Sequence, residues 1–416
     1  MSTRINPFRP NSPIGPGMFV GRFDEIVALE QSLVQTRAGQ PQHFMVTGER
    51  GIGKTSLLSY LKFVAKGEIQ VGTEKHNFLV VDVDIEKGTS AASFARRLER
   101  ALRHELGKDE KVRDFFKKSW DFVKRFEAGS VRYNGKESIT ETEDLVDELT
   151  YSLVDTANRV CSGCLEGSDF SANFDGIIIL IDEADSASED LEFGALLKML
   201  TERIQKRGCE KIMFGLAGLE NLREILRESH PSVLRVFDEI KLKRLRDADV
   251  ERVIDRCIED ANDNNEFKTK VEDDAKAYLV RLSEGYPHFI QQFGFSAFAV
   301  DNDGEIDIAD VKEGAFGRRG ALEIIGDKYY RDSFYGKIQK ESYRQVLRIM
   351  AEKWDSWVEK CEIKAKFKGK DSTLNNAIRA LRDRKIILSQ EGSRGVYRLQ
   401  HKGFALWIKY YANVEK

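Results

Sequence analysis

The sequence has little of what marks secreted, membrane-spanning or disulfide-bonded proteins. Its 416 residues include only five cysteines, an odd number without regular spacing, which favours a reducing compartment over a disulfide framework. No apolar run approaches the roughly 18 residues that a membrane-spanning helix needs. Residues 1–17 contain no apolar segment of the kind found in signal peptides. We therefore expect a soluble cytoplasmic protein without a membrane partner.

Neither sign of charge dominates, because 66 Lys and Arg residues face 69 Asp and Glu residues, a net charge of −3. This balance excludes a uniformly basic nucleic-acid coat and a disordered acidic tail. It also conceals an asymmetry. Residues 341–416 hold 17 basic and 9 acidic residues, a net charge of +8, which leaves −11 for residues 1–340. A basic carboxyl-terminal module therefore follows an acidic body, and the module's charge suggests a nucleic-acid partner.

Proline is scarce as well. Four of the seven prolines fall within residues 1–17, which predicts an extended amino-terminal arm. After the arm, short apolar runs alternate with segments of helical spacing, and buried strands separated by helices predict an α/β fold with a parallel sheet. The expected strands are residues 43–47, 78–84, 177–181 and 211–216, with 238–245 as a fifth candidate.

We expect four segments along the chain: the arm (1–22), an α/β core (23–245), a helical lid (246–338) and the basic module (339–416). Within the core, residues 90–175 form a long helical insertion in which Asn134-Gly135 signals a hairpin. In the basic module, three expected helices precede a two-stranded hairpin, which is the winged-helix form of helix-turn-helix. Ser372 is the expected N-cap of the third helix.

One motif in the core carries a specific chemistry. Residues 48–55 (GERGIGKT) fit the pattern G-x-x-x-x-G-K-[ST] at every fixed position, between an expected strand and an expected helix. Glycines let backbone N–H groups turn towards phosphate oxygens, and the start of a helix favours an anion. Lys54 would contact the β- and γ-phosphates, and Thr55 would bind Mg²⁺. The predicted nucleotide-binding residues here are Gly48, Glu49, Arg50, Gly51, Ile52, Gly53, Lys54, Thr55 and Ser56.

Two acidic residues, Asp182 and Glu183, follow the buried strand 177–181. The carboxyl ends of parallel strands form the ligand-binding edge of such sheets, so Asp182 is expected to hold Mg²⁺ and Glu183 to polarise an attacking water as general base. The pair indicates hydrolysis, since a receptor that only holds nucleotide has no need of Glu183. The alternative is a polar strand end that caps the next helix.

With this loop and this acidic pair, residues 14–300 resemble the AAA+ ATPases and their STAND-type signalling relatives. The resemblance implies ATP or ADP as ligand and Mg²⁺ as cofactor. Residues 18–22 (MFVGR) resemble the segment that packs on adenine, which implies contacts from Phe19 and Val20; a hydrophobic staple for the next helix is the alternative. Residues 234–237 resemble the arginine-finger region, so Arg235 would act on nucleotide held by a neighbouring subunit. A surface arginine is the alternative.

Two departures from the family pattern affect the expected activity. The fourth strand ends in Leu216-Ala217-Gly218, where the family usually carries a polar sensor side chain. Residues 285–287 (GYP) stand at the second sensor and lack its arginine. This second feature resembles the STAND branch and archaeal-type ATPases with winged-helix tails, whose lid contacts nucleotide through its backbone, here at Pro287. Both departures imply slow turnover.

The basic module is expected to contact DNA. An exposed helix that carries Arg and Asn suits the major groove, and Lys suits phosphates. The alternative is that the winged helix docks a protein or holds the chain inactive. The predicted DNA-binding residues are Lys364, Lys366, Lys368, Lys370, Asn375, Asn376, Arg379, Arg382 and Arg394.

These features favour an ATPase that couples its nucleotide state to self-association, in a ring or filament, and to binding of double-stranded DNA. Glu183, Lys54 and Arg235 are the expected catalytic residues. The alternative is a STAND-like signalling or defence ATPase whose tail and insertion bind a protein partner.

Overall fold

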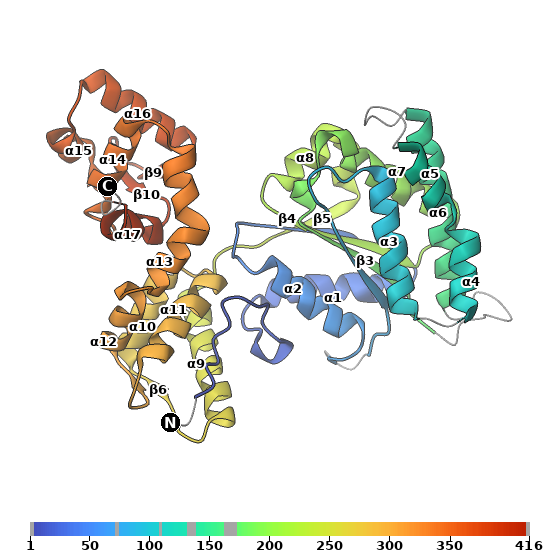
Figure 1. Cartoon of the computed structure of the whole chain (residues 1–416), viewed down its shortest axis with the longest axis horizontal. Helices are drawn as coiled ribbons and strands as arrows, with labels where there is room; N and C mark the ends of the chain where they lie inside the picture. The colour runs from blue at the N-terminus through green and yellow to red at the C-terminus, as the bar shows by residue number, and fades with distance from the viewer. Residues whose placement is uncertain (1–3, 71–74, 108–109, 131–138, 162–172, 413–416) are drawn as a thin grey trace. The chain divides into compact units, whose positions relative to one another are not determined.

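The computed structural model describes residues 4–70, 75–107, 110–130, 139–161 and 173–412 (Figure 1). The chain divides into two compact units. The first is Pro13–Lys243, and the second combines Met1–Ser12 with Arg244–Lys416. Each unit is built around its own elements. No helix in the described ranges is long and apolar enough to span a membrane.

The first unit is built on a five-stranded sheet in the order β2-β3-β4-β1-β5, and every pair of neighbours is parallel. This confirms the predicted α/β fold with a parallel sheet. Figure 1 shows helices α1 and α2 on one side of the sheet and α7 and α8 on the other. The strands are β1 (His43–Thr47), β2 (Leu79–Asp84), β3 (Ile177–Asp182), β4 (Ile212–Gly218) and β5 (Phe237–Lys241).

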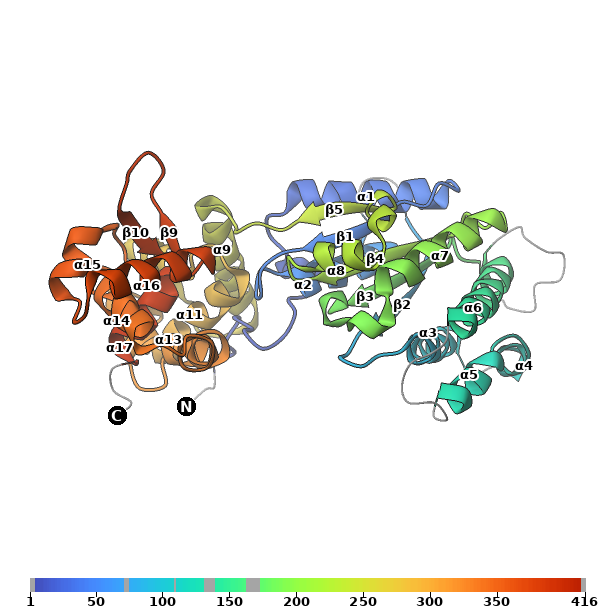
Figure 2. The ribbon, with the colours of Figure 1, turned by 90° about the horizontal axis from the view of Figure 1, so that it is seen from above.

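The helices of this unit include α1 (Phe23–Arg37), α2 (Lys54–Ala65), α7 (Phe193–Lys206) and α8 (Leu222–Ser229). The expected insertion is helical and contains α3 (Ala91–Leu106), α4 (Glu110–Ser119), α5 (Phe122–Ser130) and α6 (Ile139–Val160). Figure 2 shows these four helices grouped beyond β2 and β3. Trp120 is buried among them, and its Nε1 donates to Thr156 Oγ1 at 3.2 Å. The predicted hairpin at Asn134-Gly135 lies outside the described residues.

The register of the sheet brings the polar strand ends to one edge. Thr47 stands opposite Gly218 on one side and Lys241 on the other, and Asp84 stands opposite Asp182. Strand β4, between β1 and β3, is buried along its whole length. Parallel strands buried on both faces are built from apolar residues, so the charged residues of β3 and of the loop after β1 are confined to the carboxyl edge.

The second unit begins with a helical region: α9 (Asp247–Asn264), α10 (Asp273–Ser283), α11 (Pro287–Val300), α12 (Ile308–Phe316) and α13 (Ala321–Ile325). Two short parallel strands, β6 (Lys270–Val271) and β7 (Glu305–Ile306), join its loops.

The basic module follows with α14 (Glu341–Ala351), β8 (Val358–Glu359), α15 (Lys360–Lys366), α16 (Asp371–Asp383), β9 (Ile387–Ser389), β10 (Val396–Leu399) and α17 (Lys402–Tyr410). Its elements thus follow the predicted order of three helices and a hairpin, and β10 pairs antiparallel with both β8 and β9. The predicted N-cap of α16 is wrong: the helix begins at Asp371, so Ser372 lies inside its first turn and makes no cap.

The amino-terminal arm is fixed along the second unit. Arg4 forms an ion pair with Asp301 at 2.6 Å, and Phe8 is only 2% exposed. The backbone N–H of Arg9 donates to Gln291 Oε1 at 2.7 Å. Because Gln291 lies on α11 and Asp301 directly follows it, residues 4–9 of the arm are anchored to this helix.

His43, the first residue of β1, is held in its neutral form. Its Nδ1 accepts a hydrogen bond from the Phe214 amide at 3.0 Å. The rings of Phe214 and Phe237 both lie 5.6 Å from the His43 ring, centroid to centroid. Burial lowers the pKa of His43 to about 4.

We predict that His43 makes the first unit sensitive to acid. Its folded-state pKa lies below the value of about 6.5 in an unfolded chain, so protons bind the unfolded state first. The free energy of unfolding is therefore full above pH 6.5 and falls as the pH decreases towards 4. A His43→Asn variant, whose Oδ1 can accept the same amide hydrogen bond, should lack this loss of about 2.5 kcal/mol at pH 4.5. Urea unfolding at pH 7.5 and 4.5 measures it, and an equal pH dependence in both proteins would contradict the assignment.

Candidate phosphate-binding site

The loop after β1 turns sharply into α2. Gly51 (φ 78°) and Gly53 (φ 101°) adopt left-handed backbone conformations that side chains other than glycine rarely accept. Helix α2 begins at Lys54, and no side chain caps its first amide groups. Those amides are open to an external acceptor, and the helix dipole favours an anion there. The loop geometry thus suits a phosphate.

Lys54 supplies the positive charge of the loop. Its Nζ donates to the carbonyl oxygens of Gly48 at 3.0 Å and Glu49 at 3.1 Å. Burial lowers the pKa of Lys54, while the carboxylates of Asp185, Asp182 and Glu183 act in the opposite direction. The ammonium group is therefore influenced by the carboxylates at the end of β3 and in the turn that follows it.

Thr55 and Asp182 meet across the sheet edge. Thr55 Oγ1 donates to Asp182 Oδ2 at 2.9 Å, although the two residues are 127 positions apart. The other oxygen, Asp182 Oδ1, accepts from the backbone N–H of Glu183 at 2.8 Å. A hydroxyl and a carboxylate side by side are the hard oxygen ligands that Mg²⁺ prefers, so the two residues predicted as metal ligands fit that ion.

Glu183 occupies a strained position. Its backbone is left-handed (φ 51°, ψ 30°), and the residue is exposed at the end of β3. Such a conformation costs a residue other than glycine roughly 1–2 kcal/mol, and it persists at functional sites where the surrounding structure imposes it. The exposed carboxylate is therefore available to a ligand beside Asp182.

The segment before α1 is attached to the phosphate loop. The Arg22 side chain, 7% exposed, donates from Nη2 to the Ile52 carbonyl oxygen at 3.0 Å. The Phe19 ring stacks on Tyr60 of α2, with centroids 5.1 Å apart, and Val20 is half-buried. The predicted adenine segment thus lies against the loop and α2.

Sequence reasoning missed three residues of this site: Arg22, Tyr60 and Asp185. Arg22 closes the quoted segment MFVGR, and Asp185 closes the run Asp-Glu-Ala-Asp at the end of β3. Tyr60 lies six residues after Lys54 on α2, a spacing that places it nearly two turns along the same helix. Only Asp185 carries a local signal, the repeated acid.

Arg235 lies at the amino ends of the strands, opposite to the carboxyl ends that carry the phosphate loop and the acidic residues. It ends a short 3₁₀ turn (Pro231–Arg235) just before β5, and β5 starts opposite His43, at the amino end of β1. There Arg235 lines a cavity of about 520 Å³ together with residues of α7 and the loop before β1. The structure therefore does not bring Arg235 to the phosphate loop of its own chain. Pro287, the first residue of α11, belongs to the second unit, and its predicted contact with nucleotide stays a prediction.

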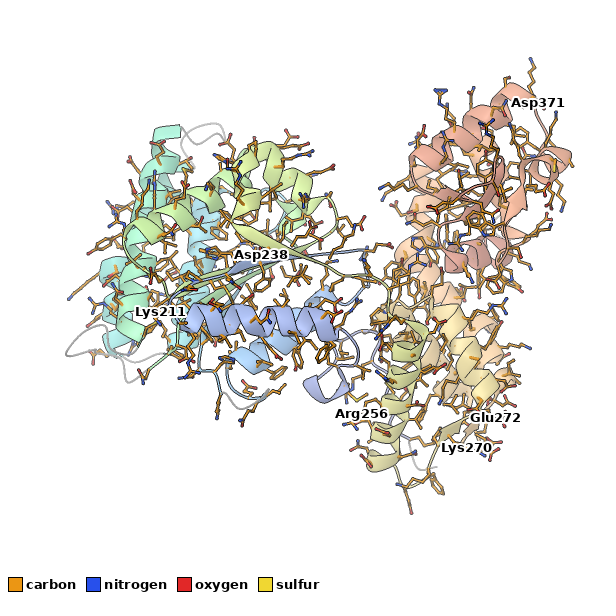
Figure 3. All side chains as sticks on the ribbon, turned by 180° about the vertical axis from the view of Figure 1, so that it is seen from behind. Lys211, Asp238, Arg256, Lys270, Glu272 and Asp371 are labelled. Atoms are coloured by element: carbon orange, nitrogen blue, oxygen red, sulfur yellow. The ribbon has the colours of Figure 1, made fainter. Side chains whose placement is uncertain are left out.

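The predicted DNA-binding residues are all exposed, but three of the cations form ion pairs. Lys364 pairs with Asp371, labelled in Figure 3, at 2.5 Å, and Lys366 pairs with Glu352. Arg382 lies 3.6 Å from Asp383. Within the described ranges no ion pair engages four others: Lys368, Lys370, Arg379 and Arg394. Asn375 and Asn376 lie on α16 beside Arg379 and Arg382.

Comparison with known proteins supports the same family. Residues 18–207 match the family described as the AAA ATPase domain, which confirms the predicted resemblance to AAA+ P-loop ATPases for this region. A search of curated protein sequences finds no significant match.

Several solved structures are similar to this chain, and the first of those named here shares its fold. The ORC2 protein of Aeropyrum pernix, described in ADPNP-ADP complexes, has a TM-score of 0.51 and 14% identity, over 91% of this chain and 89% of that one. The Cdc6p protein of Pyrobaculum aerophilum scores 0.44 at 11% identity, over 96% and 94%. The ORC1 protein of Aeropyrum pernix, described in complex with DNA, scores 0.44 at 16% identity, over 95% and 94%.

We predict that the backbone strain at Glu183 reverses the usual order of alanine and glycine stability. Glycine accepts the left-handed conformation without cost, so Glu183→Gly should be about 1 kcal/mol more stable than Glu183→Ala. At Asp182, whose backbone is that of a strand, the alanine variant should be the more stable one. Urea unfolding of the four variants tests this, and the same order at both positions would show that Glu183 is not strained.

Proposed function

We propose that this chain, whose residues 18–207 match the AAA ATPase domain, is a Mg²⁺-dependent switch that binds and slowly hydrolyses ATP and couples its nucleotide state to self-association and DNA binding. The observation that carries the proposal is the meeting of Thr55 and Asp182 at 2.9 Å, beside a loop that holds Lys54. Phosphate, metal and attacking water then have neighbouring places at one edge of the sheet.

The residues of the site divide the chemistry among them. The loop amides and Lys54 bind and orient the phosphates, while Thr55 and Asp182 hold Mg²⁺, which neutralises phosphate charge. Glu183 accepts the proton of the attacking water as general base. The polar sensor side chain expected at the end of β4 is missing, because that strand ends at Gly218. We therefore expect slow turnover.

The base of the nucleotide is assigned to the segment before α1. Phe19 and Val20 offer apolar surface, and Arg22 ties the segment to Ile52. The similar fold of an archaeal protein described with ADPNP and ADP supports a nucleotide as ligand.

The basic module is assigned to DNA. Helix α16 buries Leu374, Ala377, Ile378 and Leu381 and leaves its Asn and Arg residues exposed. A helix packed in this way presents side chains that can read base edges in a major groove, as expected of a winged helix.

The position of Arg235 supports self-association. It is exposed, and its sheet edge is opposite to the phosphate loop, so it can reach nucleotide only on another copy of the chain. We assign it as an arginine finger that acts between subunits in a ring or filament.

A signalling or defence ATPase with a protein partner is the second candidate. The ion pairs of Lys364 and Lys366 favour a protein partner, because they neutralise two positive charges that would otherwise pair with DNA phosphates. The insertion, in which Trp120 packs with Phe116 and Phe122, gives such a partner a separate surface.

We predict that Lys54→Ala and Glu183→Gln separate binding from hydrolysis. Loss of the loop charge should abolish measurable ATP binding, whereas Glu183→Gln should bind ATP and release phosphate at least 100-fold more slowly. Fluorescent-nucleotide titration and a phosphate-release assay measure the two effects. Unchanged turnover in Lys54→Ala would exclude the proposal.

We predict that DNA binding by the full chain weakens steeply with salt, and that the uncompensated cations set the slope. Replacement of Lys368, Lys370, Arg379 and Arg394 by Ala should reduce the slope of log affinity against log salt by up to about 3.5. The control, Lys364→Ala with Asp371→Ala, removes a compensated pair and should leave the slope unchanged. Anisotropy titrations at roughly 50–300 mM salt, a range in which phosphate contacts dominate the affinity, measure this slope. Absence of duplex binding at low salt would favour the protein partner.

A further inference from the structure

The end of β4 lacks a polar side chain, yet the space beside it is filled. A Cβ atom added to Gly218 would lie 2.8 Å from Asp185 Oδ1 and 3.1 Å from the Asp185 backbone nitrogen. Real Cβ atoms essentially never approach another heavy atom as closely as 2.8 Å. A side chain at Gly218 and the carboxylate of Asp185 therefore compete for one place.

Asp185 also connects two strand ends. It lies in the 3₁₀ turn Ala184–Ser186 that follows β3, and its Oδ1 accepts from the backbone N–H of Leu219, the residue after β4, at 2.9 Å. The turn after β3 is thereby held beside the end of the neighbouring strand. Burial lowers the pKa of Lys54, and the negative charge of Asp185, like that of Asp182 and Glu183, acts in the opposite direction.

From this geometry we infer that Asp185 is a positioning residue for hydrolysis, which takes the place of the missing side chain at the end of β4. The inference rests on the proposed function and deepens it. Asp185 holds the turn that carries Glu183 against the end of β4, which keeps the base aligned. Its carboxylate also adds negative charge near the Lys54 ammonium, whose own hydrogen bonds go to the carbonyl oxygens of Gly48 and Glu49. Turnover therefore depends on Asp185 more than nucleotide affinity does.

A carboxylate suits this role differently from an amide or a hydroxyl. An ionised Asp has no hydrogen to donate to a phosphate oxygen, and it attracts Lys54 instead. Its hydrogen bond to Leu219 needs only an acceptor, which asparagine also offers. The charge and the hydrogen bond can thus be separated by one isosteric substitution.

The test compares wild type, Asp185→Asn and Asp185→Ala in the full chain. We expect Asp185→Asn to unfold at the wild-type temperature, to keep KM for ATP within threefold, and to lose at least tenfold in kcat. Asp185→Ala should lose kcat and also unfold earlier. A wild-type kcat in Asp185→Asn would overturn the inference, and so would a fall in its unfolding temperature that accounts for the lost activity, which would make Asp185 a structural cap.

Gly218→Ala gives a second, independent readout. Its methyl group would lie 2.8 Å from Asp185 Oδ1 and 3.0 Å from Leu222 Cδ2. Gly218→Ala should therefore lower kcat in wild type and lower it less in Asp185→Ala, where the closest of these contacts is removed. Effects that simply multiply would show that the two positions act separately, against the inference. The assay of wild type distinguishes a failure of the proposed hydrolysis from a failure of the role assigned to Asp185. If wild type binds ATP without turnover, the proposed hydrolysis fails, whereas an active wild type with an equally active Asp185→Asn overturns only the role of Asp185.

Discussion

The hydrogen bond between Thr55, on the helix after β1, and Asp182, at the end of β3, spans strand β4, whose glycines carry no side chain into the space between its neighbours. Strand β4 separates β1 from β3, and its glycines keep that separation clear. A Cβ on Gly215 would lie 2.3 Å from the Phe44 ring and 2.8 Å from the Leu180 side chain, so bulky residues on β1 and β3 use the space above β4. Gly218 likewise has no side chain and so leaves room for the Asp185 carboxylate. The two glycines of β4 therefore leave the space that the Phe44 and Leu180 side chains and the Asp185 carboxylate occupy.

The sequence predicts this part of the site because its determinants are local. Strand β3 is an unbroken apolar run, and the loop motif fixes its own backbone through glycine. The fifth strand shows the limit: residues 238–245 were expected, and the strand is Phe237–Lys241. It is an edge strand with exposed residues such as Asp238 (Figure 3), so no apolar run marks its ends. Arg22, Tyr60 and the anchoring of Phe8 depend on contacts between distant segments, which no local pattern contains.

The second unit anchors both of the chain segments that connect it to the first unit. The chain passes between the units at Ser12–Pro13 and Lys243–Arg244. Phe8 anchors the segment before the first passage. After the second, Arg244 donates to Tyr286 Oη at 3.0 Å and to Glu284 at 3.2 Å, and Glu284 in turn accepts from the amide of Gly403 at 2.8 Å. Since Glu284 precedes α11 and Gly403 lies on α17, one polar cluster joins the connection, the helical region and the basic module. Partners in such a cluster are costly to separate, so these three parts are expected to move together.

Because these three parts are expected to move together, the charge asymmetry of the chain bears on how the basic module binds and releases its partner. The module has an excess of eight positive charges. Some of its cations are paired, such as Lys364 with Asp371, whereas Lys368, Lys370, Arg379 and Arg394 are exposed and have no ion pair within the described residues. A ligand held there by a few phosphate contacts binds weakly enough to be released by a change of about 1–3 kcal/mol, the usual size of coupling between two sites. The slow ATP hydrolysis that we propose suits that arrangement, because a long-lived nucleotide state would give the module time to bind or release its partner before the phosphate site is reset.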